Sequence, residues 1–150
     1  MMQPSPAATV VISTYNNPRY LAMMLAGYAR QTTSDFEVVV ADDGSGAETT
    51  ALLDKVRAGG FPVPLIHAWQ PDQGFRQGRA MNLAALKSTG RQLVFTDGDC
   101  VPTSTMVTEH LRAARNKTHV VGGHIRLDEA ASRKLNVPNV ERGEHEALNT

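Results

Sequence analysis

Two aspartates separated by one glycine stand just after a short apolar stretch of the sequence. Residues 93–95 are Leu-Val-Phe, the composition of a buried strand, and Asp97-Gly98-Asp99 follows after one threonine. Gly98 has no side chain and tolerates unusual backbone angles, so both carboxylates can point toward one place. Carboxylate oxygens suit Mg²⁺ or Mn²⁺, which take further ligands from water and substrate phosphates. The motif therefore predicts a divalent-cation site, and the alternative is a solvated turn.

Polar side chains also follow the first two strands that the sequence predicts. Their clusters are Thr14-Tyr15-Asn16 and Asp42-Asp43-Gly44-Ser45. Because the carboxyl ends of parallel strands meet at one edge of a sheet, these clusters and the acidic motif can line a single crevice. In the functional interpretation, Asp42 accepts a hydrogen bond from a base such as uracil and Tyr15 supplies a stacking face. In the alternative, Asp42 and Asp43 form a helix cap with a turn.

Two arginines lie in and just after a glycine-bearing loop, Gln73-Gly-Phe-Arg-Gln-Gly78. Arg76 and Arg79 stand before and at the start of a predicted helix, where backbone N–H groups and the helix dipole favour anions. The forked donors of arginine match phosphate oxygens, so a diphosphate would fit there. The alternative is that both side chains are solvated. Asn82, one turn further, is either an inward polar anchor or a ligand contact.

Other residues that can do chemistry carry weaker signals. The lone thiol of Cys100 and the indole of Trp69 are interpreted as core groups. The histidines lack metal-ligand spacing and are assigned to no site; they are His67, His110, His119, His124 and His145.

The composition is that of an ordinary globular protein of one domain. The 150 residues are 41% hydrophobic and 20% charged, and the formal net charge is zero. This balance gives no electrostatic support for a nucleic-acid partner. The single cysteine excludes an internal disulfide. No apolar run reaches the ~20 residues of a membrane-spanning helix, and residues 1–8 lack the features of a signal peptide. We expect a cytoplasmic protein, with peripheral attachment to the inner membrane left open.

Strands and helices are predicted to alternate along the chain. Apolar and β-branched runs predict strands at residues 8–14, 36–41, 64–69, 93–96 and 119–127. Helical spacing of apolar residues predicts helices at residues 18–30, 47–58, 79–89 and 104–116. Asn17 is predicted to cap the first helix, and Thr103 or Ser104 the last. This order indicates an α/β fold with a mostly parallel sheet flanked by helices.

Four blocks of the sequence resemble, in order, motifs of the inverting family 2 glycosyltransferases of the GT-A fold. The blocks are VVISTYNN at 10–17, FEVVVADDGS at 36–45, GFR at 74–76 leading into AMNLA at 80–84, and FTDGDCVP at 95–102. The resemblance extends over nearly all of residues 8–127. The last two blocks are most similar to the bacterial polysaccharide and chondroitin-polymerase-like branch.

This resemblance implies a donor site for a nucleotide-diphosphate sugar, with a uridine-diphosphate sugar expected. It implies metal-assisted transfer of the sugar to a carbohydrate acceptor with inversion. Asp42 would bind uracil, and Asp99 would coordinate a Mn²⁺ or Mg²⁺ that bridges the diphosphate. The expected donor-binding residues are Thr14, Tyr15, Asn16, Asp42, Asp43, Arg76, Arg79, Asn82, Asp97 and Gly98, and the expected metal ligands are Asp99 and Asp97.

One position departs from the family pattern. Many members have arginine immediately before the asparagine that matches Asn82, whereas this chain has Met81. We therefore assign no such role to Met81, and we expect Arg79 or Arg76 to contact the base or the phosphates.

An inverting transfer also needs a general base that takes the proton of the acceptor hydroxyl. In the family this carboxylate comes from the C-terminal half, and no matching acidic block is present here. The acidic residues of the last segment are interpreted as solvated; they are Glu141, Glu144 and Glu146.

We therefore expect residues 1–7 to be a lead, residues 8–127 a donor-binding half domain, and residues 128–150 an incomplete or flexible segment, with the acceptor half lacking. Surface left uncovered by that half would favour a homodimer. The alternative function is a catalytically incomplete nucleotide-sugar-binding module or a truncated fragment. A dinucleotide-dependent oxidoreductase is disfavoured, because residues 15–18 are not a glycine-rich phosphate turn.

Overall fold

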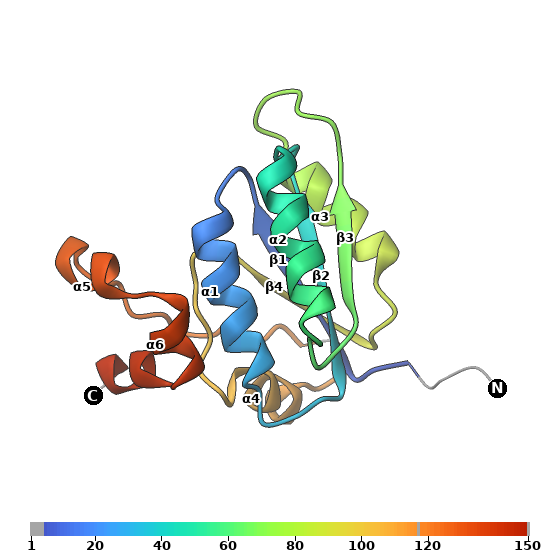
Figure 1. Ribbon diagram of the computed structural model, residues 1–150. Coiled ribbons are helices and arrows are strands. Elements are labelled where there is room, and N and C mark those ends of the chain that lie inside the picture. The colour runs from blue at the N-terminus through green and yellow to red at the C-terminus, as the bar shows by residue number, and fades with distance from the viewer. Residues whose placement is uncertain (1–4, 117, 150) are drawn as a thin grey trace.

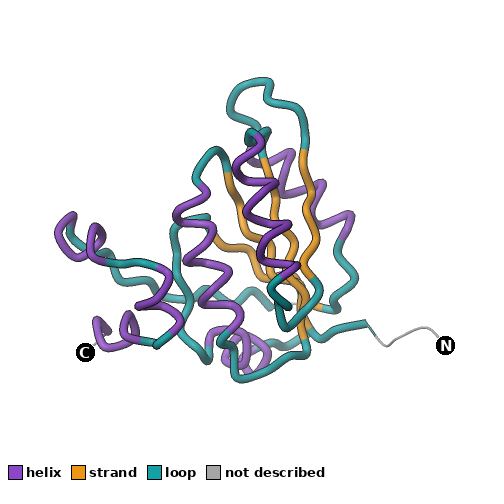
Figure 2. The backbone as a smooth tube through the Cα atoms, viewed as in Figure 1, coloured by secondary structure: helices purple, strands orange, loops and turns teal. Residues whose placement is uncertain are grey.

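The computed structural model describes residues 5–116 and 118–149, which form a parallel sheet with helices on both faces (Figure 1 and Figure 2). The strands are β1 (Ala8–Thr14), β2 (Phe36–Asp42), β3 (Leu65–Trp69) and β4 (Gln92–Thr96). Their order is β3-β2-β1-β4, and every pairing is parallel. The predicted α/β fold is confirmed. Every residue of β1 and β2 is buried, as expected of central strands covered on both faces.

One face of the sheet is covered by more helices than the other. They are α1 (Pro18–Ala29), α2 (Ala47–Ala58), α3 (Gln77–Lys87) and α4 (Met106–Ala113). Alternate strand residues such as Ile12 and Val40 pack with Leu25 of α1 and Leu53 of α2. The intervening residues pack with Ala80 and Ala84 of α3 on the other face (Figure 1). None of the described helices is long and apolar enough to cross a membrane.

The sequence predicted the N-terminal cap of α1 correctly and the N-terminal cap of α4 incorrectly. The Oδ1 atom of Asn17 accepts a hydrogen bond from the backbone N–H of Tyr20 at 3.4 Å, so the predicted cap of α1 is confirmed. The predicted cap of the later helix is wrong, because α4 begins only at Met106. The hydroxyl of Ser104 donates to Glu146 instead, and the side chain of Gln31 accepts the N–H of Val107.

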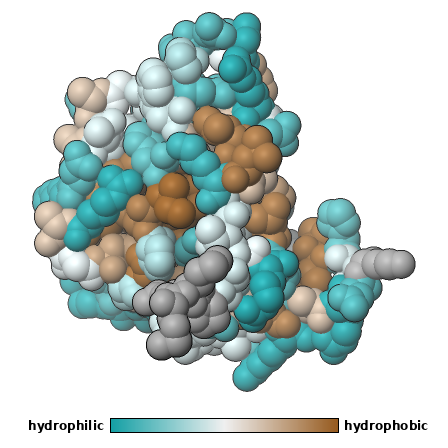
Figure 3. Space-filling model, turned by 90° about the vertical axis from the view of Figure 1, so that its right-hand side faces the viewer, coloured by the Kyte–Doolittle hydropathy of each residue, from teal (hydrophilic) through white to brown (hydrophobic). Residues whose placement is uncertain are grey.

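The predicted strand at residues 119–127 is also wrong. The structure describes all of these residues and forms no strand there. Val121 and Ile125 are 88% and 56% exposed. Strand preference is realised only when a neighbouring strand takes the backbone hydrogen bonds and a surface buries the side chains. No described strand pairs with this segment, and most of its side chains are exposed, with Leu127 partly buried. Figure 3 shows hydrophobic side chains gathered at the surface of one face of the molecule, among hydrophilic ones.

The segment after residue 128 contains helical elements that the sequence analysis did not assign. They are α5 (Glu129–Lys134), α6 (Val137–Glu141) and the 3₁₀ helix η1 (Glu144–Asn149). Leu135 and Val140 are buried against Met23 of α1. Arg19 of α1 donates to the backbone carbonyls of Ser132 and Leu135, at 3.1 Å each. The segment therefore packs along the side of α1, where Figure 1 draws it in red.

A buried carboxylate joins β2 to β1 and to the turn before β4. Glu37 is 3% exposed and accepts hydrogen bonds from the hydroxyl of Thr9 at 2.6 Å and from the N–H of Thr89 at 2.6 Å. The Thr89 hydroxyl and the Gly90 N–H add two more. Burial raises the pKa of Glu37, but these hydrogen bonds outweigh it, so the pKa lies below its usual value and the group stays ionised.

We predict that Glu37→Ala lowers the free energy of unfolding by about 3 kcal/mol, because four donors, among them the buried Thr9 hydroxyl, lose their charged acceptor. Urea titration followed by circular dichroism measures this. A depressed carboxyl pKa stabilises the folded state above the unfolded-state value of about 4.3, and that contribution disappears as the pH falls through the folded-state value. The difference between wild type and variant should therefore shrink in acid. Glu48→Ala, on the exposed first turn of α2, is the control and should cost less than about 1 kcal/mol. Equal losses in both variants would contradict the prediction.

Candidate functional site

The polar clusters that follow β1, β2 and β4 lie at one edge of the sheet. Thr14 pairs with Asp42, and Asp42 pairs with Trp69 of β3. Thr96, the last residue of β4, pairs with Ile12 and is followed directly by the acidic motif. Since all the pairings are parallel, these strands deliver their following residues to the same edge, as the sequence predicted.

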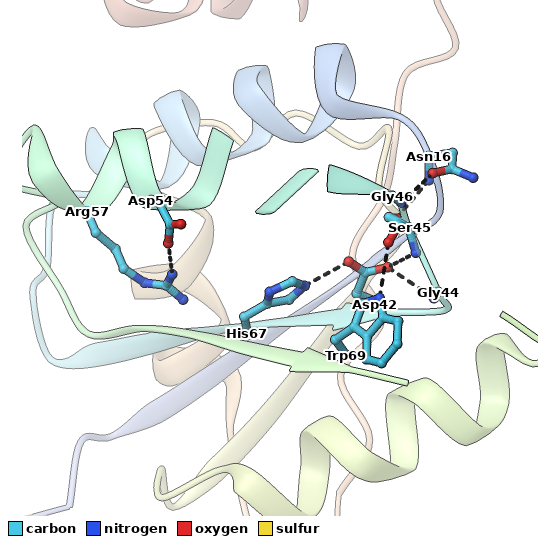
Figure 4. A network of polar contacts seen from close by, with 9 residues as sticks. All are labelled: Asn16, Asp42, Gly44, Ser45, Gly46, Asp54, Arg57, His67 and Trp69. Carbon is cyan, nitrogen blue, oxygen red and sulfur yellow. Dashed lines mark hydrogen bonds and ion pairs between the residues drawn. The ribbon is translucent and has the colours of Figure 1, made fainter. Parts of the chain in front are cut away.

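The end of β1 is tied to the end of β2 through Asn16. The Asn16 N–H donates to the hydroxyl of Ser45 at 2.8 Å, and its Oδ1 accepts the N–H of Gly46 at 2.9 Å (Figure 4). Asn16 has a left-handed φ of 45°, which asparagine tolerates better than most residues. Thr14 is buried beside it. Asn16 therefore joins two loops and has its side-chain oxygen engaged in that role.

Tyr15 presents its ring at the surface of this edge. It is 51% exposed, and its hydroxyl donates to Oδ2 of Asp72 at 2.9 Å. This hydrogen bond to a carboxylate raises the pKa of Tyr15. Asp72 lies on the loop between β3 and α3, which rises above the sheet edge in Figure 1. The hydrogen bond fixes the hydroxyl end of the side chain, and the ring remains exposed enough for a planar ligand to stack on it.

Asp42 is not available to a ligand, and this corrects its predicted role. It has no exposed surface. Its Oδ1 accepts the N–H groups of Gly44 and Ser45 at 3.2 and 2.7 Å, and its Oδ2 accepts from Nε2 of His67 at 2.7 Å (Figure 4). The turn-forming alternative describes this residue. Burial raises the pKa of Asp42, but the bonds from His67 and Ser45 outweigh it and lower the pKa overall.

Asp43 anchors the loop that carries Arg76. Its Oδ1 accepts from Nε2 of Gln70 at 2.7 Å, and its Oδ2 accepts the backbone N–H of Arg76 at 2.7 Å. Gln70 is 4% exposed, and its Oε1 has no hydrogen-bond partner in the described part of the chain. Gln77 of α3 donates to the hydroxyl of Ser13 at 3.0 Å. These contacts bring the start of α3 against the ends of β1 and β2.

The predicted phosphate-binding side chains are exposed. Arg76 precedes α3 directly, and its Nη1 donates to Oε1 of Gln73 at 2.9 Å. Arg79 lies in the first turn of α3 and is exposed. Asn82 is exposed as well, so its interpretation as an inward anchor is wrong. The helix start and its two guanidinium groups together form a positive end that can accept an anion.

Asp97 and Asp99 are both exposed on the loop that follows β4. A Cβ atom added to Gly98 would lie 2.2 Å from the backbone oxygen of Ser13, so only glycine lets this loop approach β1. The thiol of Cys100 donates weakly to Oδ1 of Asp99 at 3.7 Å. Burial and the two carboxylates raise the pKa of this thiol.

The core interpretations of Cys100 and Trp69 are wrong. The thiol belongs to an exposed residue. Trp69 is 47% exposed, and its indole N–H donates to the carbonyl oxygen of Ser45 at 3.1 Å (Figure 4). The indole thus braces the turn after β2. The sequence did not indicate the roles of His67 and Gln70. Their only signal was position: His67 lies in the predicted strand at 64–69, Gln70 follows it, and the neighbouring strand ends in aspartates.

The two exposed aspartates fit a divalent cation that is shared with a ligand. Neither takes part in an ion pair with another described residue. Within residues 5–116 and 118–149, no group of three or more His, Cys, Asp or Glu side chains could hold a metal alone. Mg²⁺ and Mn²⁺ accept carboxylate oxygens and commonly take the remaining ligands from water and phosphate. The donor set matches that chemistry.

Comparison with known proteins shows similarity to glycosyltransferases. The model of the family described as "Glycosyl transferase family 2" matches residues 9–146. The chain is 40% identical over 94 residues to validoxylamine A glucosyltransferase of Streptomyces hygroscopicus subsp. jinggangensis, covering 61% of this chain and 22% of that protein. It is 31% identical over 115 residues to the uncharacterized glycosyltransferase YfnE of Bacillus subtilis, covering 76% and 28%.

A solved structure agrees with these relatives. Residues 1–349 of TarS from S. aureus, in complex with UDP-GlcNAc, match with a TM-score of 0.60 and 25% identity, covering 70% of this chain and 30% of that one. This match supports the assignment of the sheet and its helices to a GT-A architecture. The chain spans less than a third of the length of each of these three proteins.

We predict that Gly98→Ala lowers the free energy of unfolding by about 1–3 kcal/mol, because the added methyl group must push the acidic loop away from the Ser13 carbonyl. Thermal unfolding followed by circular dichroism measures this. Gly123→Ala is the matched control, since apart from its chain neighbours no described residue has an atom within 4 Å of a Cβ atom built there. An unfolding temperature of Gly98→Ala equal to that of wild type would show that the loop is not held in this close contact.

Proposed function

The chain belongs to glycosyl transferase family 2, and we propose that it binds a uridine-diphosphate sugar along the sheet edge formed by β1, β2 and β4. The sugar would be transferred to a carbohydrate acceptor with inversion, in polysaccharide synthesis of the bacterial type. The observation that carries the proposal is the meeting of three groups at one edge: an open tyrosine ring, a positive helix start and two exposed carboxylates.

The nucleoside would lie against the ends of β1 and β2. Tyr15 offers its half-exposed ring to the base, and Thr14 lies behind it. Because Asp42 has no exposed surface whereas Asp43 keeps 5%, we assign the contact with the uracil N–H to Asp43. Each oxygen of Asp43 accepts one hydrogen bond in the structure and a carboxylate oxygen can accept two, so acceptor capacity remains. The solved TarS complexes with UDP and with UDP-GlcNAc support the choice of nucleotide.

The diphosphate would lie between the arginines and the acidic loop. Arg76 and Arg79 stand at the start of α3, where helix dipole and guanidinium donors both favour phosphate oxygens. Asp97 and Asp99 would hold Mn²⁺ or Mg²⁺ from the opposite side. Such a cation would offset the charge that builds on the departing nucleoside diphosphate. The chain's own contribution is to hold the leaving group in place between these two sets of side chains.

A second candidate function is donor binding without complete catalysis. Glu144 forms an ion pair with Arg142 at 2.6 Å. Glu146, which was expected to be solvated, is partly buried and pairs with Arg30 at 2.7 Å. Both carboxylates are thus engaged away from the sheet edge, and neither is placed to act as the general base. Turnover of donor in the presence of a glycan acceptor separates the two functions, because only a complete enzyme releases uridine diphosphate.

We predict that Mn²⁺ strengthens the binding of uridine diphosphate to the wild type and that Asp99→Asn removes most of this gain. Calorimetric titration with and without Mn²⁺ measures both affinities. A lost carboxylate ligand should weaken the metal-dependent part at least about tenfold. Asp54→Asn, an exposed change on α2, should leave both affinities unchanged. Metal-independent binding by wild type would contradict the cation site and leave the nucleotide site standing.

We also predict that Arg79→Ala weakens the binding of uridine diphosphate about tenfold, the effect of losing one charge-assisted hydrogen bond of about 1.5 kcal/mol. The same titration measures it. Arg112→Ala, which removes an exposed arginine of α4 paired with Glu109, is the control. Unchanged affinity in Arg79→Ala would assign the phosphate contact to Arg76 alone.

A further inference from the structure

The loop that carries Asp97 and Asp99 is held at both of its ends. At the first end, Gly98 lies so close to the Ser13 carbonyl that a Cβ atom there would be 2.2 Å away. At the second end, Pro102 is buried against α1, where a Cβ atom on Gly27 would lie 2.8 Å from the Pro102 ring. Asp99 therefore stands on a short span between two fixed points, and Asp97 lies between the end of β4 and the first of them.

Two adjacent residues of η1 also hold the second end through hydrogen bonds. His145 is 8% exposed, and its Nε2–H donates to the carbonyl oxygen of Pro102 at 2.9 Å. Oε1 of Glu146 accepts the backbone N–H of Ser104 at 3.1 Å, and Oε2 accepts the Ser104 hydroxyl at 3.2 Å. We call His145 and Glu146 the η1 clamp. It satisfies backbone groups that come three to five residues after Asp99 in the sequence.

The η1 clamp is itself fixed to α1. Oε1 of Glu146 accepts from Nη1 of Arg30 at 2.7 Å, and both side chains are shielded to about three quarters. Burial raises the pKa of Glu146, but the bonds from Arg30 and Ser104 outweigh it and keep the carboxyl ionised. A Cβ atom on Gly143 would collide with the Arg30 guanidinium, so the chain turns into η1 by passing directly over it.

Other contacts to the same loop do not depend on the clamp. The side chain of Gln31 donates to the carbonyl oxygen of Thr103 at 2.7 Å. The backbone N–H of Thr32 donates to the carbonyl oxygen of Ser104 at 2.9 Å. Loss of the clamp would therefore loosen the loop without detaching it from α1. Variants that remove the clamp can therefore change the order of the acidic motif without unfolding the protein.

We propose that His145 and Glu146 are positioning residues for the acidic motif and that they bring the segment after residue 128 into the donor site. Two nearby carboxylates repel each other, and a small divalent cation demands a fixed arrangement of oxygens. A loop that is ordered before binding loses less entropy when the cation arrives. The proposal rests on the proposed function, because it presumes that Asp97 and Asp99 hold a cation beside the diphosphate.

The test compares variants that remove or keep the clamp's hydrogen bonds. Glu146→Ala removes the acceptor of Ser104, and His145→Phe keeps an aromatic ring but removes the donor to Pro102. His145→Gln keeps an N–H donor at similar reach and should restore the wild-type result. Glu144→Ala is the matched control, because this exposed glutamate of the same 3₁₀ helix contacts Arg142 and Asn139 and not the acidic loop.

Two readouts are measured for each variant, in addition to its unfolding temperature. The first is the affinity for uridine diphosphate with and without Mn²⁺, by calorimetry. The gain due to Mn²⁺ should fall about tenfold in Glu146→Ala and His145→Phe, as is typical when residues that support metal ligands are lost, while metal-free affinity stays within about twofold. The second is amide hydrogen exchange of residues 97–101 in metal-free protein, which should be faster in both variants and unchanged in Glu144→Ala.

The outcomes separate this inference from the proposed function. If wild type binds uridine diphosphate without any dependence on Mn²⁺, the cation site is wrong and the inference is overturned with it. If wild type shows the dependence and both clamp variants keep it in full, only the positioning role is overturned. If metal-free and metal-dependent binding fall together with the unfolding temperature, the clamp serves stability alone, and the positioning role is again overturned.

Discussion

The parallel register of β1 with β2 and β4 is the constraint on which the candidate site depends. Thr14 pairs with Asp42, and Ile12 pairs with Thr96, so the residues that follow each strand emerge side by side. Both central strands are buried on both faces, and a slip of one residue would turn their apolar side chains to the wrong face. Core packing therefore determines where the groups at the edge are placed.

Some polar residues at this edge of the sheet stabilise the loops, and others are exposed to solvent. Asp42 and Asn16 have their oxygens engaged in backbone hydrogen bonds that shape the turns after β2 and β1. Tyr15, Arg79 and Asp99 remain exposed. Buried polar groups must be satisfied inside the protein, and a turn acceptor with no exposed surface, such as Asp42, is lost to ligand binding. Adjacent residues of one motif can therefore have opposite roles, as Asp42 and Asp43 do in our proposal.

The sequence predicted the fold and the shared edge well, because strands 8–14 and 36–41 and the cap at Asn17 are encoded by local patterns. It failed where the outcome depends on distant partners. The run at 119–127 has the composition of a strand but no neighbour to pair with. Asp42 was misassigned because its burial depends on His67, which is far away in the sequence. The same holds for Glu146, whose polarity indicated solvent and whose partner is Arg30.

The acidic loop shows how the rest of the fold makes an unfavourable arrangement stable. Asp97 and Asp99 have like charges one residue apart, with no cationic side chain paired to them among the described residues. Such a pair lowers stability unless other contacts hold the backbone, and functional sites commonly concentrate strain of this kind. Here the contacts come from β1 through Ser13, from α1 and from η1. The segment after residue 128, which the sequence predicted to be incomplete or flexible, is thus one of the three supports of the loop.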